Sequence, residues 1–439
     1  MSETVAIVTL GCKTNQFESQ LMEEHLRVAG YRIVPFETGA DLVIVNTCAV
    51  TSVSEAQSRN LVRRCRRLNP SCRVVVTGCC AQLHPEDVQR LPGVDLVLGN
   101  EEKNNITGYL PQNGIHVTNV ERRLPLEFSG MPVTGRSRAY VQIQTGCDAF
   151  CSYCIVPYAR GRSRSLAPER VLELVARLEE TGFTEVVLTG IHIGCYGRDL
   201  PEKTDLAALV RRILAQTGIR RVRLGSIEPH ELGEDLLELA FASPRVCPHF
   251  HIPLQSGDDA VLERMRRPYT GAFFRALVER IHRALPQAAL GVDVMTGFPG
   301  ETPEAFEHTF RLLEALPVSH LHVFPYSRRA GTPAATFPDQ VPAEISKERA
   351  ARLRSLGQEK RGAFMERCVG RTLQVVVERR GGADTLCRGL SENYLPVLFS
   401  AEHAKERELL PVVIKSRHDD ALEGVLKEER KTEEKEEMA

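Results

Sequence analysis

Three features are missing from this 439-residue sequence, and each absence excludes a class of protein. The chain has no long low-complexity tract, and its 42% hydrophobic content is typical of a globular rather than a disordered protein. No apolar run approaches the roughly 20 residues that a membrane-spanning helix needs. The first residues, MSETVAIVTLGCK, also lack the basic region and apolar core of a secretion signal. We therefore expect a cytoplasmic protein that makes no membrane contact.

The cytoplasmic location gives meaning to the thirteen cysteines. A reducing compartment keeps thiols free, so metal ligation or catalysis is favoured over disulfide bridges. The odd number of cysteines points in the same direction. Length adds a second expectation, because a single hydrophobic core seldom grows beyond roughly 250 to 300 residues. The chain therefore predicts two or three domains.

The net charge is only −1, but the charges are unevenly distributed. The stretch from Arg59 to Arg73 contains six arginines and no acid, whereas the tail after Glu423 is rich in acids. A basic cluster is the electrostatic mark of a partner that carries phosphates, although a solvated helix face is the commoner explanation of a run that stands alone. The cluster supports a nucleic-acid partner only in combination with other signs.

The first region, residues 2–115, alternates short β-branched runs with amphipathic stretches. The runs VAIVTL, DLVIVN and RVVVTG predict buried parallel strands, with helices that begin near Gln16 and Ser54. This alternation predicts a small doubly wound α/β domain. The stretch from Arg122 to Arg136 is richer in Pro and Gly, and we interpret it as a linker.

The central region, residues 133–363, repeats the alternation on a larger scale. Its predicted strands are AYVQIQ, TEVVLT, RVRLGS, HFHIPL, ALGVDVMTG and HLHVFPY. Right-handed crossovers make a partial (βα)6 barrel the economical fold, with its chemistry at the carboxyl ends of the strands. Residues 366–428 lose the helical period and predict a small β-barrel, followed by a charged tail at residues 429–439.

The strongest local signal is the trio Cys147, Cys151 and Cys154, which follows the first strand of the central region. Three thiolates at this spacing can hold one face of a 4Fe-4S cluster and leave the fourth iron free to bind a substrate. The alternative is a zinc site, but structural zinc sites prefer four ligands in paired spacings, and no second pair lies nearby in the sequence. The pattern therefore favours an open cluster.

The three-then-two spacing of these cysteines resembles the radical S-adenosylmethionine superfamily. The resemblance implies that S-adenosylmethionine binds the open iron and is cleaved by one electron to a 5′-deoxyadenosyl radical. In that case the cofactor carries the difficult chemistry, and the protein supplies placement and the exclusion of water.

A second trio comes from residues that lie far apart in the sequence. Cys12, Cys48 and Cys79 each follow one of the predicted strands of the first region. Because the carboxyl ends of parallel strands meet at the edge where open α/β sheets bind ligands, we expect these thiols to converge and to hold a second open cluster. A single free cysteine is more often a small buried hydrophobe. Cys80 is an alternative to Cys79, which we favour because it occupies the turn position after Gly78.

The two trios in this order resemble the methylthiotransferase family, through the segments TLGCKTNQ, VNTCAV, TGCCAQ and CSYCIVPYARGRSRS. The resemblance implies an auxiliary cluster in the first domain, a radical domain in the centre and a small RNA-binding β domain of the TRAM type at the end. CIVPYARGRSRS and the SIEP stretch at Ser226 to Pro229 are most similar to the branch that modifies threonylcarbamoyladenosine at position 37 of tRNA. The aromatic residue that usually follows the auxiliary cysteine is replaced by Cys80.

The family resemblance also implies a reaction scheme. One S-adenosylmethionine methylates a sulfur on the second cluster, another supplies the radical that removes hydrogen from adenine carbon 2, and the methylthio group is delivered to that carbon. The implied partners are the anticodon stem-loop of tRNA and an electron donor such as a flavodoxin, and we expect a monomer. The alternatives are a target of isopentenyladenosine in tRNA or of a ribosomal-protein aspartate, or a non-catalytic RNA-binding protein with structural clusters.

Several residues at predicted strand ends are candidates for binding the cofactor. Thr189 and Gly190 close the second central strand, where the superfamily resemblance implies a close backbone approach to the methionine end of S-adenosylmethionine. Glu228 follows the third strand and could accept the ribose hydroxyls, although a surface carboxylate is an equal alternative. Gln255 and Ser256 follow the fourth strand. The later segment GFPGET is either a cofactor loop or a turn with a helix cap.

A group of arginines beside the first trio faces a single acid, Asp148. Arginine presents a planar fork to phosphate and stacks on bases, so this density predicts an RNA-facing rim, with salt bridges as the alternative for any one of them. The arginines are Arg136, Arg138, Arg160, Arg162 and Arg164. The cysteines without partner spacing are interpreted as packing or surface residues: Cys65, Cys72, Cys195, Cys247, Cys368 and Cys387.

Overall fold

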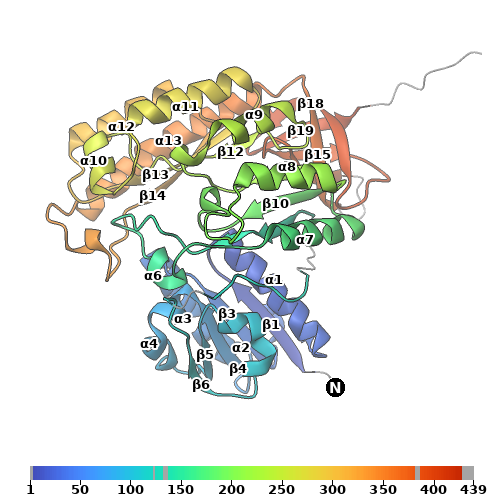
Figure 1. The fold of residues 1–439 in the computed structure, drawn as a ribbon, viewed down its shortest axis with the longest axis vertical. Helices are drawn as coiled ribbons and strands as arrows, with labels where there is room; N and C mark the ends of the chain where they lie inside the picture. Colours follow the sequence, from blue (N-terminus) through green and yellow to red (C-terminus); the bar gives the residue numbers. More distant parts are fainter. Residues whose placement is uncertain (1–2, 122–123, 132–136, 381–385, 428–439) are drawn as a thin grey trace, which may run out of the picture.

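The computed structural model describes residues 3–121, 124–131, 137–380 and 386–427. Figure 1 shows three units: a blue N-terminal sheet with its helices, a green to orange half barrel above it, and a red barrel beside the half barrel. These units confirm the predicted class, an α/β chain that ends in a small β-barrel. The predicted charged tail at residues 429–439 lies outside the described residues.

The N-terminal unit is a parallel sheet with the strand order β2-β1-β3-β4-β5-β6. Every residue of β3 is buried, as expected for a strand covered on both faces. The order reverses between β1 and β3, the switch point at which doubly wound sheets bind ligands. The strands are β1 Thr4–Thr9, β2 Arg32–Ile33, β3 Leu42–Thr47, β4 Arg73–Gly78, β5 Leu96–Leu98 and β6 Gly114–His116. The helices are α1 Lys13–Val28, α2 Ser52–Leu68, α3 Cys79–Leu83, α4 Pro85–Gln89 and α5 Ile106–Tyr109.

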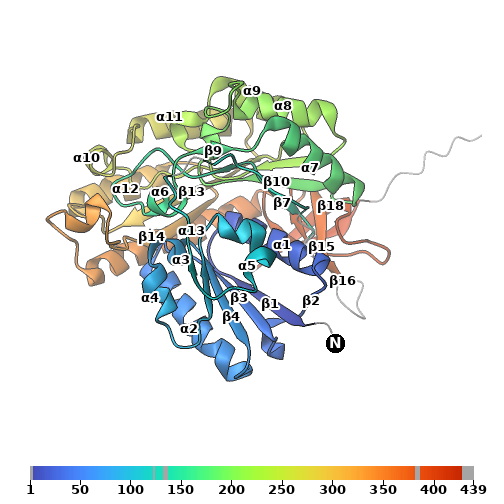
Figure 2. The same ribbon diagram turned by 60° about the horizontal axis from the view of Figure 1, so that its bottom comes forward.

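Helix α1 joins the first sheet to the half barrel, and Figure 2 shows it lying between them. Its Met22 and Leu26 pack in the core of the first sheet, whereas Phe17 and Leu21 belong to the large core that contains β7. One helix therefore buries two apolar stripes in two domains, which fixes the first sheet against the half barrel.

The central unit is a half barrel of six parallel strands in two sheets, β11-β10-β7 and β12-β13-β14. Parallel bridges from Val222 to Val246 and from Ser226 to His251 join the two sheets. These strands confirm the six predicted from the sequence: β7 Ala139–Gln142, β10 Glu185–Thr189, β11 Arg221–Leu224, β12 His249–His251, β13 Ala289–Thr296 and β14 His320–Pro325.

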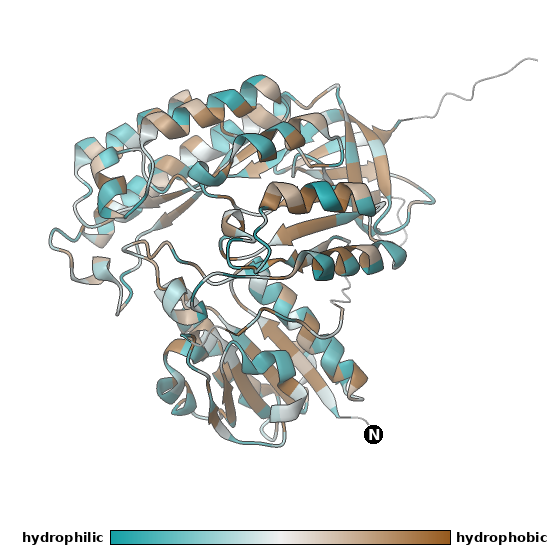
Figure 3. Cartoon of the chain, in the orientation of Figure 1, coloured by the Kyte–Doolittle hydropathy of each residue, from teal (hydrophilic) through white to brown (hydrophobic). Residues whose placement is uncertain are grey.

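Helices cover the outside of the half barrel, and their apolar residues face its strands. Figure 3 shows the strands mostly in brown and the outer helices with much teal. The helices are α7 Pro168–Glu180, α8 Leu206–Gln216, α9 Glu234–Ala242, α10 Asp259–Arg264, α11 Gly271–Ala284, α12 Pro303–Ala315 and α13 Ala343–Glu366. The short helix α6 Val156–Arg160 packs instead against α3 of the first unit. A short antiparallel pair, β8 Gln144–Thr145 and β9 Arg164–Ser165, frames the loop between β7 and α7.

The C-terminal unit is a closed barrel with the strand order β15-β16-β17-β19-β18. The sequence predicted four of its strands but not the last, whose apolar residues are interrupted by Glu423 and Gly424. This strand closes the barrel through a parallel pairing with β17 and an antiparallel pairing with β18. The strands are β15 Thr372–Arg380, β16 Leu386–Ser391, β17 Pro396–Ser400, β18 Leu409–His418 and β19 Ala421–Leu426.

The described part of the predicted linker, residues 124–131, packs against the protein. Leu126 and Phe128 are buried in the large core, and the Phe128 ring meets the Phe17 ring edge to face at 5.0 Å. The segment therefore adds to the junction between the first two units. Across the part of the chain that the structure describes, no helix is both long and apolar enough to cross a membrane.

Candidate functional site

Cys12, Cys48 and Cys79 meet at the carboxyl edge of the first sheet. Cys12 caps α1, Cys48 follows β3, and Cys79 begins α3 directly after β4. Burial raises the pKa of the Cys48 thiol to about 11, and the nearby Cys79 and Cys12 thiols add to the effect. The three cysteines that the sequence placed at equivalent strand ends are therefore neighbours in the folded chain.

Two glycines with positive φ allow this convergence. A Cβ on Gly11 would lie 2.8 Å from Cys48 Cβ, and one on Gly78 would lie 2.5 Å from the Thr47 carbonyl oxygen. Both contacts are shorter than any side chain tolerates, and the left-handed backbone of each also favours glycine. The chain between strand end and helix therefore approaches the neighbouring strand closely only because these positions lack side chains.

The adjacent cysteines Cys79 and Cys80 face different surroundings. The Cys79 thiol lies close enough to Arg160, Lys103 and Cys48 to contribute to the pKa shift of each. Cys80 instead lines a separate cavity of about 220 Å³. Burial raises the pKa of Cys80 to about 12, and the nearby Glu55 carboxylate contributes. The geometry therefore favours Cys79 as the third member of the first trio.

The second trio lies in the loop between β8 and α6. Burial raises the pKa of Cys154 to about 12, and the thiols of Cys151 and Cys147 contribute in the same direction. The loop is tightly folded, because a Cβ on Gly146 would meet the Arg162 carbonyl oxygen and Phe150 adopts a left-handed backbone with φ 44°. These three thiols lie close together, as the short sequence spacing predicted.

Hydrogen-bond donors surround the sulfurs of the second trio. The Ala149 amide donates to Cys147 Sγ at 3.4 Å, and Arg267 Nη1 donates to Cys151 Sγ at 3.3 Å. His192 Nδ1 lies 3.3 Å from Cys147 Sγ. N–H groups aimed at sulfur stabilise thiolate ligands and tune iron–sulfur clusters. The donor set of each trio, three free thiols at one site, fits an iron–sulfur cluster with one iron left open.

The predicted contacts to S-adenosylmethionine lie after the carboxyl ends of β10 to β12, and Glu228 reaches the second trio through Arg267. A Cβ on Gly190 would lie 2.7 Å from the Gln144 carbonyl oxygen, so a bulkier residue cannot replace it without displacing the β8 strand. The Glu228 carboxylate pairs with Arg267, the same arginine that contacts Cys151, and burial raises the pKa of Glu228. Glu228 is thus linked to the cysteine loop rather than standing free at the surface.

Gln255 and Ser256 behave differently, although they are adjacent. Gln255 has φ 66°, and its buried Oε1 has no hydrogen-bond partner among the described residues, which suits a polar ligand at this edge. The Ser256 hydroxyl instead lies 3.3 Å from Thr309 Oγ1 on α12 and accepts from the Asp258 amide. Thr189 is buried at the end of β10.

The GFPGET segment ends in a helix cap. The Thr302 side chain accepts a hydrogen bond from the Ala305 amide at the first turn of α12. This geometry matches the second of the two interpretations that the sequence left open, a turn with a helix cap at Thr302.

A buried ion-pair network connects the two trios. Arg160, at the end of α6, donates to Glu18 Oε1 at 2.7 Å and to Asn15 Oδ1 at 2.6 Å, and Lys103 Nζ reaches Glu18 Oε2 at 2.6 Å. Arg160 and Lys103 are almost fully buried. The helix that follows the second trio is therefore fixed to the helix that follows Cys12.

This network corrects the expectation of an arginine rim for RNA. Arg160 pairs with Glu18, Arg164 with Glu101 and Arg138 with Glu378, and each of these arginines is largely buried. Arg162 remains half exposed, in an ion pair with Asp148, and Arg136 lies outside the described residues. The salt-bridge alternative holds for the buried three, since their acidic partners come from distant segments that a local sequence pattern cannot pair.

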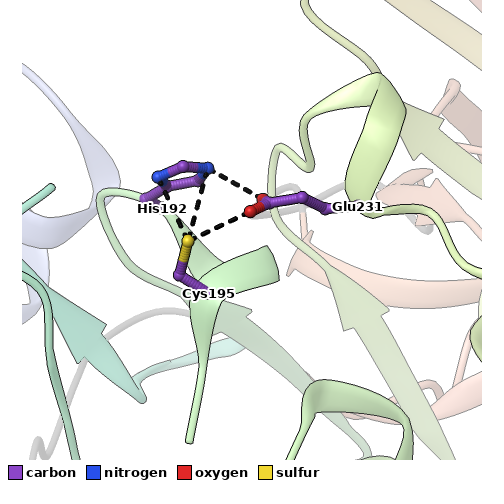
Figure 4. A group of neighbouring side chains, drawn as sticks. All are labelled: His192, Cys195 and Glu231. Carbon is purple, nitrogen blue, oxygen red and sulfur yellow. Dashed lines mark hydrogen bonds and ion pairs between the residues drawn. The ribbon is translucent and has the colours of Figure 1, made fainter. Parts of the chain in front are cut away.

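The structure also contains a polar group that the sequence did not predict (Figure 4). His192 Nε2 lies 2.8 Å from Glu231 Oε2, and Cys195 Sγ donates to Glu231 Oε1 at 3.0 Å. Burial lowers the pKa of His192, but hydrogen bonds with Cys147, Cys195 and Glu231 outweigh burial and raise it. Cys195 is therefore not a simple packing residue. The i, i+3 spacing of His192 and Cys195 after β10 was the available signal.

These three side chains have the chemistry of metal ligands, but a cation already occupies their neighbourhood. Arg198 lies 3.3 Å from Glu231 Oε1 and 3.4 Å from Cys195 Sγ. The guanidinium balances the carboxylate, so we assign no ion to this group.

Comparison with known proteins first defines the class. The model of the Radical SAM superfamily matches residues 141–313, and that of Uncharacterized protein family UPF0004 matches residues 4–99. The solved structure of TsrM, a radical S-adenosylmethionine methyltransferase from Kitasatospora setae, has a TM-score of 0.55 at 18% identity and covers 87% of this chain and 79% of that chain. The half barrel with its three-cysteine loop is that of a radical S-adenosylmethionine enzyme.

Curated relatives then define the family. The chain is 38% identical over 408 residues to the threonylcarbamoyladenosine tRNA methylthiotransferase MtaB of Bacillus subtilis, covering 90% of each chain. It is 34% identical over 437 residues to the tRNA-2-methylthio-N(6)-dimethylallyladenosine synthase of Pelotomaculum thermopropionicum, covering 96% of this chain and 97% of that one. The chain belongs to the methylthiotransferase family of radical S-adenosylmethionine enzymes.

Proposed function

We propose that this enzyme converts N6-threonylcarbamoyladenosine at position 37 of tRNA to its 2-methylthio derivative. The observation that carries the proposal is the presence of two cysteine trios, at the switch point of the first sheet and in the first loop of the half barrel. Five relatives that are 36% to 39% identical over 86% to 90% of this chain are named for threonylcarbamoyladenosine, which supports the choice of substrate.

The cofactors are two 4Fe-4S clusters and S-adenosylmethionine, which together supply the radical and the methylthio group. In our proposal Cys147, Cys151 and Cys154 hold the radical cluster, and Cys12, Cys48 and Cys79 hold the auxiliary one. Arg267 donates to Cys151 and orients Glu228, so one guanidinium positions both a cluster ligand and the carboxylate that we assign to the ribose.

The remaining assignments concern S-adenosylmethionine. In our proposal its methionine end approaches the backbone at Thr189 and Gly190, and Gln255 offers the buried Oε1 that lacks a partner among the described residues. Ser256 is predicted to bind with them, but its hydroxyl already contacts Thr309. We therefore give Ser256 only a supporting role, through the turn that carries Gln255.

We propose the following division of the chain. Residues 2–115 form the auxiliary-cluster domain, residues 133–363 the radical domain, residues 366–428 the RNA-binding barrel, and residues 429–439 a charged tail. Helix α1 packs into two different hydrophobic cores, which supports a boundary between the first and second domains. The closed order of β15 to β19 supports a separate third domain. We further propose that the protein works as a monomer in the cytoplasm, where its tRNA substrate occurs, with a flavodoxin-like electron donor.

Two measurements test the proposed function. Mass spectrometry of tRNA from a strain that lacks the gene should show threonylcarbamoyladenosine without its methylthio group, and restoration by the wild-type gene provides the control. Persistence of that methylthio group in the deletion strain overturns the choice of substrate.

The second measurement addresses the chemistry. Anaerobically reconstituted protein should contain about eight iron atoms per chain if both trios bind four-iron clusters. It should also cleave S-adenosylmethionine to 5′-deoxyadenosine, and Cys151→Ala should abolish that cleavage. If the protein were a non-catalytic RNA-binding protein, neither the wild type nor Cys151→Ala would produce 5′-deoxyadenosine.

A further inference from the structure

The inner face of the half barrel carries an unusual concentration of histidines. In β12 to β14 the apolar residues Phe250, Leu290 and Val292 point outward into the core under the helices. The alternate residues face inward, and the strand register aligns His251 with Gly291 and His320, and Asp293 with His322. The inward residues are His249, His251, Asp293, His320 and His322.

Some of these polar side chains stay accessible to solvent rather than closing into a packed core. His251 Nε2 and His322 Nδ1 both lie 2.9 Å from Asp293 Oδ1, yet His251 and Asp293 each keep about a fifth of the side chain accessible, 20% and 19%. Gly291 leaves room for the two neighbouring imidazole rings, because a Cβ there would lie 2.4 Å from the His320 ring and 3.1 Å from His251 Nδ1. The single carboxylate of Asp293 thus faces two histidines.

Lys13 approaches these histidines from the first domain, with His249 nearby. Its Nζ lies 5.6 Å from the centre of the Tyr394 ring, and the centre of the His249 ring lies 4.5 Å from the same point. Within the described residues Lys13 Nζ makes no ion pair and no hydrogen bond. Glu185, the carboxylate whose charge acts on Lys13, already pairs with Arg221 and Arg223.

The guanidinium groups of Arg223 and Arg138 lie near Lys13 and add to the positive charge around it. His249 is 2% exposed, and both of its ring nitrogens lack a partner among the described residues. An ammonium and a buried imidazole without acceptors are costly unless a ligand supplies one. The missing group is an anion with hydrogen-bond acceptors.

We propose that Lys13 and the inward histidines, His251 foremost, bind the carboxylate of the threonylcarbamoyl group on the substrate adenosine. This inference rests on the proposed function and names the residues that select its substrate. The threonylcarbamoyl group ends in a carboxylate, whereas a dimethylallyl group is uncharged and calls for an apolar pocket. Because Lys13 directly follows Cys12, a carboxylate held by Lys13 keeps the attached adenine beside the first cysteine trio.

The test uses the reconstituted full-length enzyme and two anticodon stem-loop RNAs that differ only at residue 37. One carries threonylcarbamoyladenosine, and the other carries its methyl ester, which removes the negative charge. The wild type should prefer the acid. Lys13→Met should lower kcat/KM for the acid about 10- to 100-fold, mainly through KM, because the variant has no ammonium to pair with the carboxylate. The ester should be affected little, and Lys347→Met, on the exposed face of α13, should behave as wild type.

The outcomes separate the two proposals. If Lys13→Met slows both RNAs equally, or keeps the preference for the acid, the carboxylate site is wrong while the proposed function stands. If the wild type modifies neither RNA, the proposed function fails and the inference falls with it. Iron content is measured for each variant. Should Lys13→Met lose iron through its neighbour Cys12, the same loss of preference for the acid is required of His251→Gln, which lies on β12, and its absence overturns the inference.

Discussion

At the scale of single residues, the decisive choice is between Cys79 and Cys80. Cys79→Ala should remove about four of the roughly eight irons, because the first trio then keeps two thiols and a four-iron cluster needs three or more ligands. Cys80→Ala should retain the full iron content, since its thiol faces the separate cavity beside Glu55. Iron analysis and electron paramagnetic resonance of both reconstituted variants provide the measurement. Equal losses in the two variants would show that the assignment is wrong.

In the sequence, a single glycine, Gly78, was the signal that favoured Cys79 over Cys80. Gly78 ends β4 with φ 94° and turns the chain so that the next residue begins a helix beside Cys48. A turn position after a strand can be predicted from sequence. The hydrogen bond between Cys147 and His192 could not, because it depends on a contact between loops 45 residues apart.

At the scale of secondary-structure elements, β10 and β11 share a fully buried charge cluster. Burial raises the pKa of Glu185, but Arg221 and Arg223 outweigh burial and lower it to about 2. A depressed pKa means that this stabilisation is complete above the unfolded-state value, near 4.5, and is lost as the pH falls toward 2. Arg223 also donates to the Ser391 and Glu392 carbonyl oxygens, so the cluster fastens the C-terminal barrel to the half barrel.

Glu185→Gln therefore has a defined pH signature. It should lower the midpoint of urea denaturation at pH 7, because two buried guanidinium groups lose their counter-charge, at a cost of roughly 3 to 5 kcal/mol. The difference from wild type should shrink as the pH is lowered from about 6 to about 3. Glu173→Gln, on the exposed side of α7, is the control and should leave the denaturation midpoint nearly unchanged. A constant difference between Glu185→Gln and wild type at every pH would contradict the prediction.

The elements themselves were mostly predictable. Continuous apolar runs identified the parallel strands of the first two domains, because strands covered on both faces leave no polar alternation. The sequence did not reveal the short strands β2, β5 and β6, or the last strand, β19, whose apolar residues are interrupted by Glu423 and Gly424. Tertiary context decided these elements, because neighbouring strands determine their pairing.

At the scale of the whole molecule, positive charge lies on α2 rather than around the cysteine loop. Arg63 and Arg67 are exposed on this helix, and neither makes an ion pair among the described residues. Replacing both by alanine should weaken binding of an anticodon stem-loop and reduce the slope of log Kd against log salt by about 0.7 to 0.9 for each phosphate that is no longer neutralised. The double variant Arg211→Ala/Arg212→Ala on α8, where both side chains have acidic partners, is the control. An unchanged slope would show that Arg63 and Arg67 on α2 do not contact the RNA.

The arginines show why a charge pattern in sequence is a weak guide to a surface. Arg138, Arg160 and Arg164 lie close together along the chain, yet each finds a carboxylate from a distant segment and is withdrawn from solvent. Burial of charge depends on partners that only the folded chain brings together. The isolated run on α2, which looked less informative, stays exposed.

The Arg160 network has a consequence for how the enzyme exchanges its reactants. Separating the first sheet from the half barrel would pull Arg160 away from Glu18, whereas Lys103 would stay beside Glu18 in the first unit, and breaking this buried ion pair carries a large energetic penalty. This junction is therefore a fixed joint and not a hinge. We therefore expect a bulky nucleotide to enter, and spent cofactor to leave, at another edge of the protein.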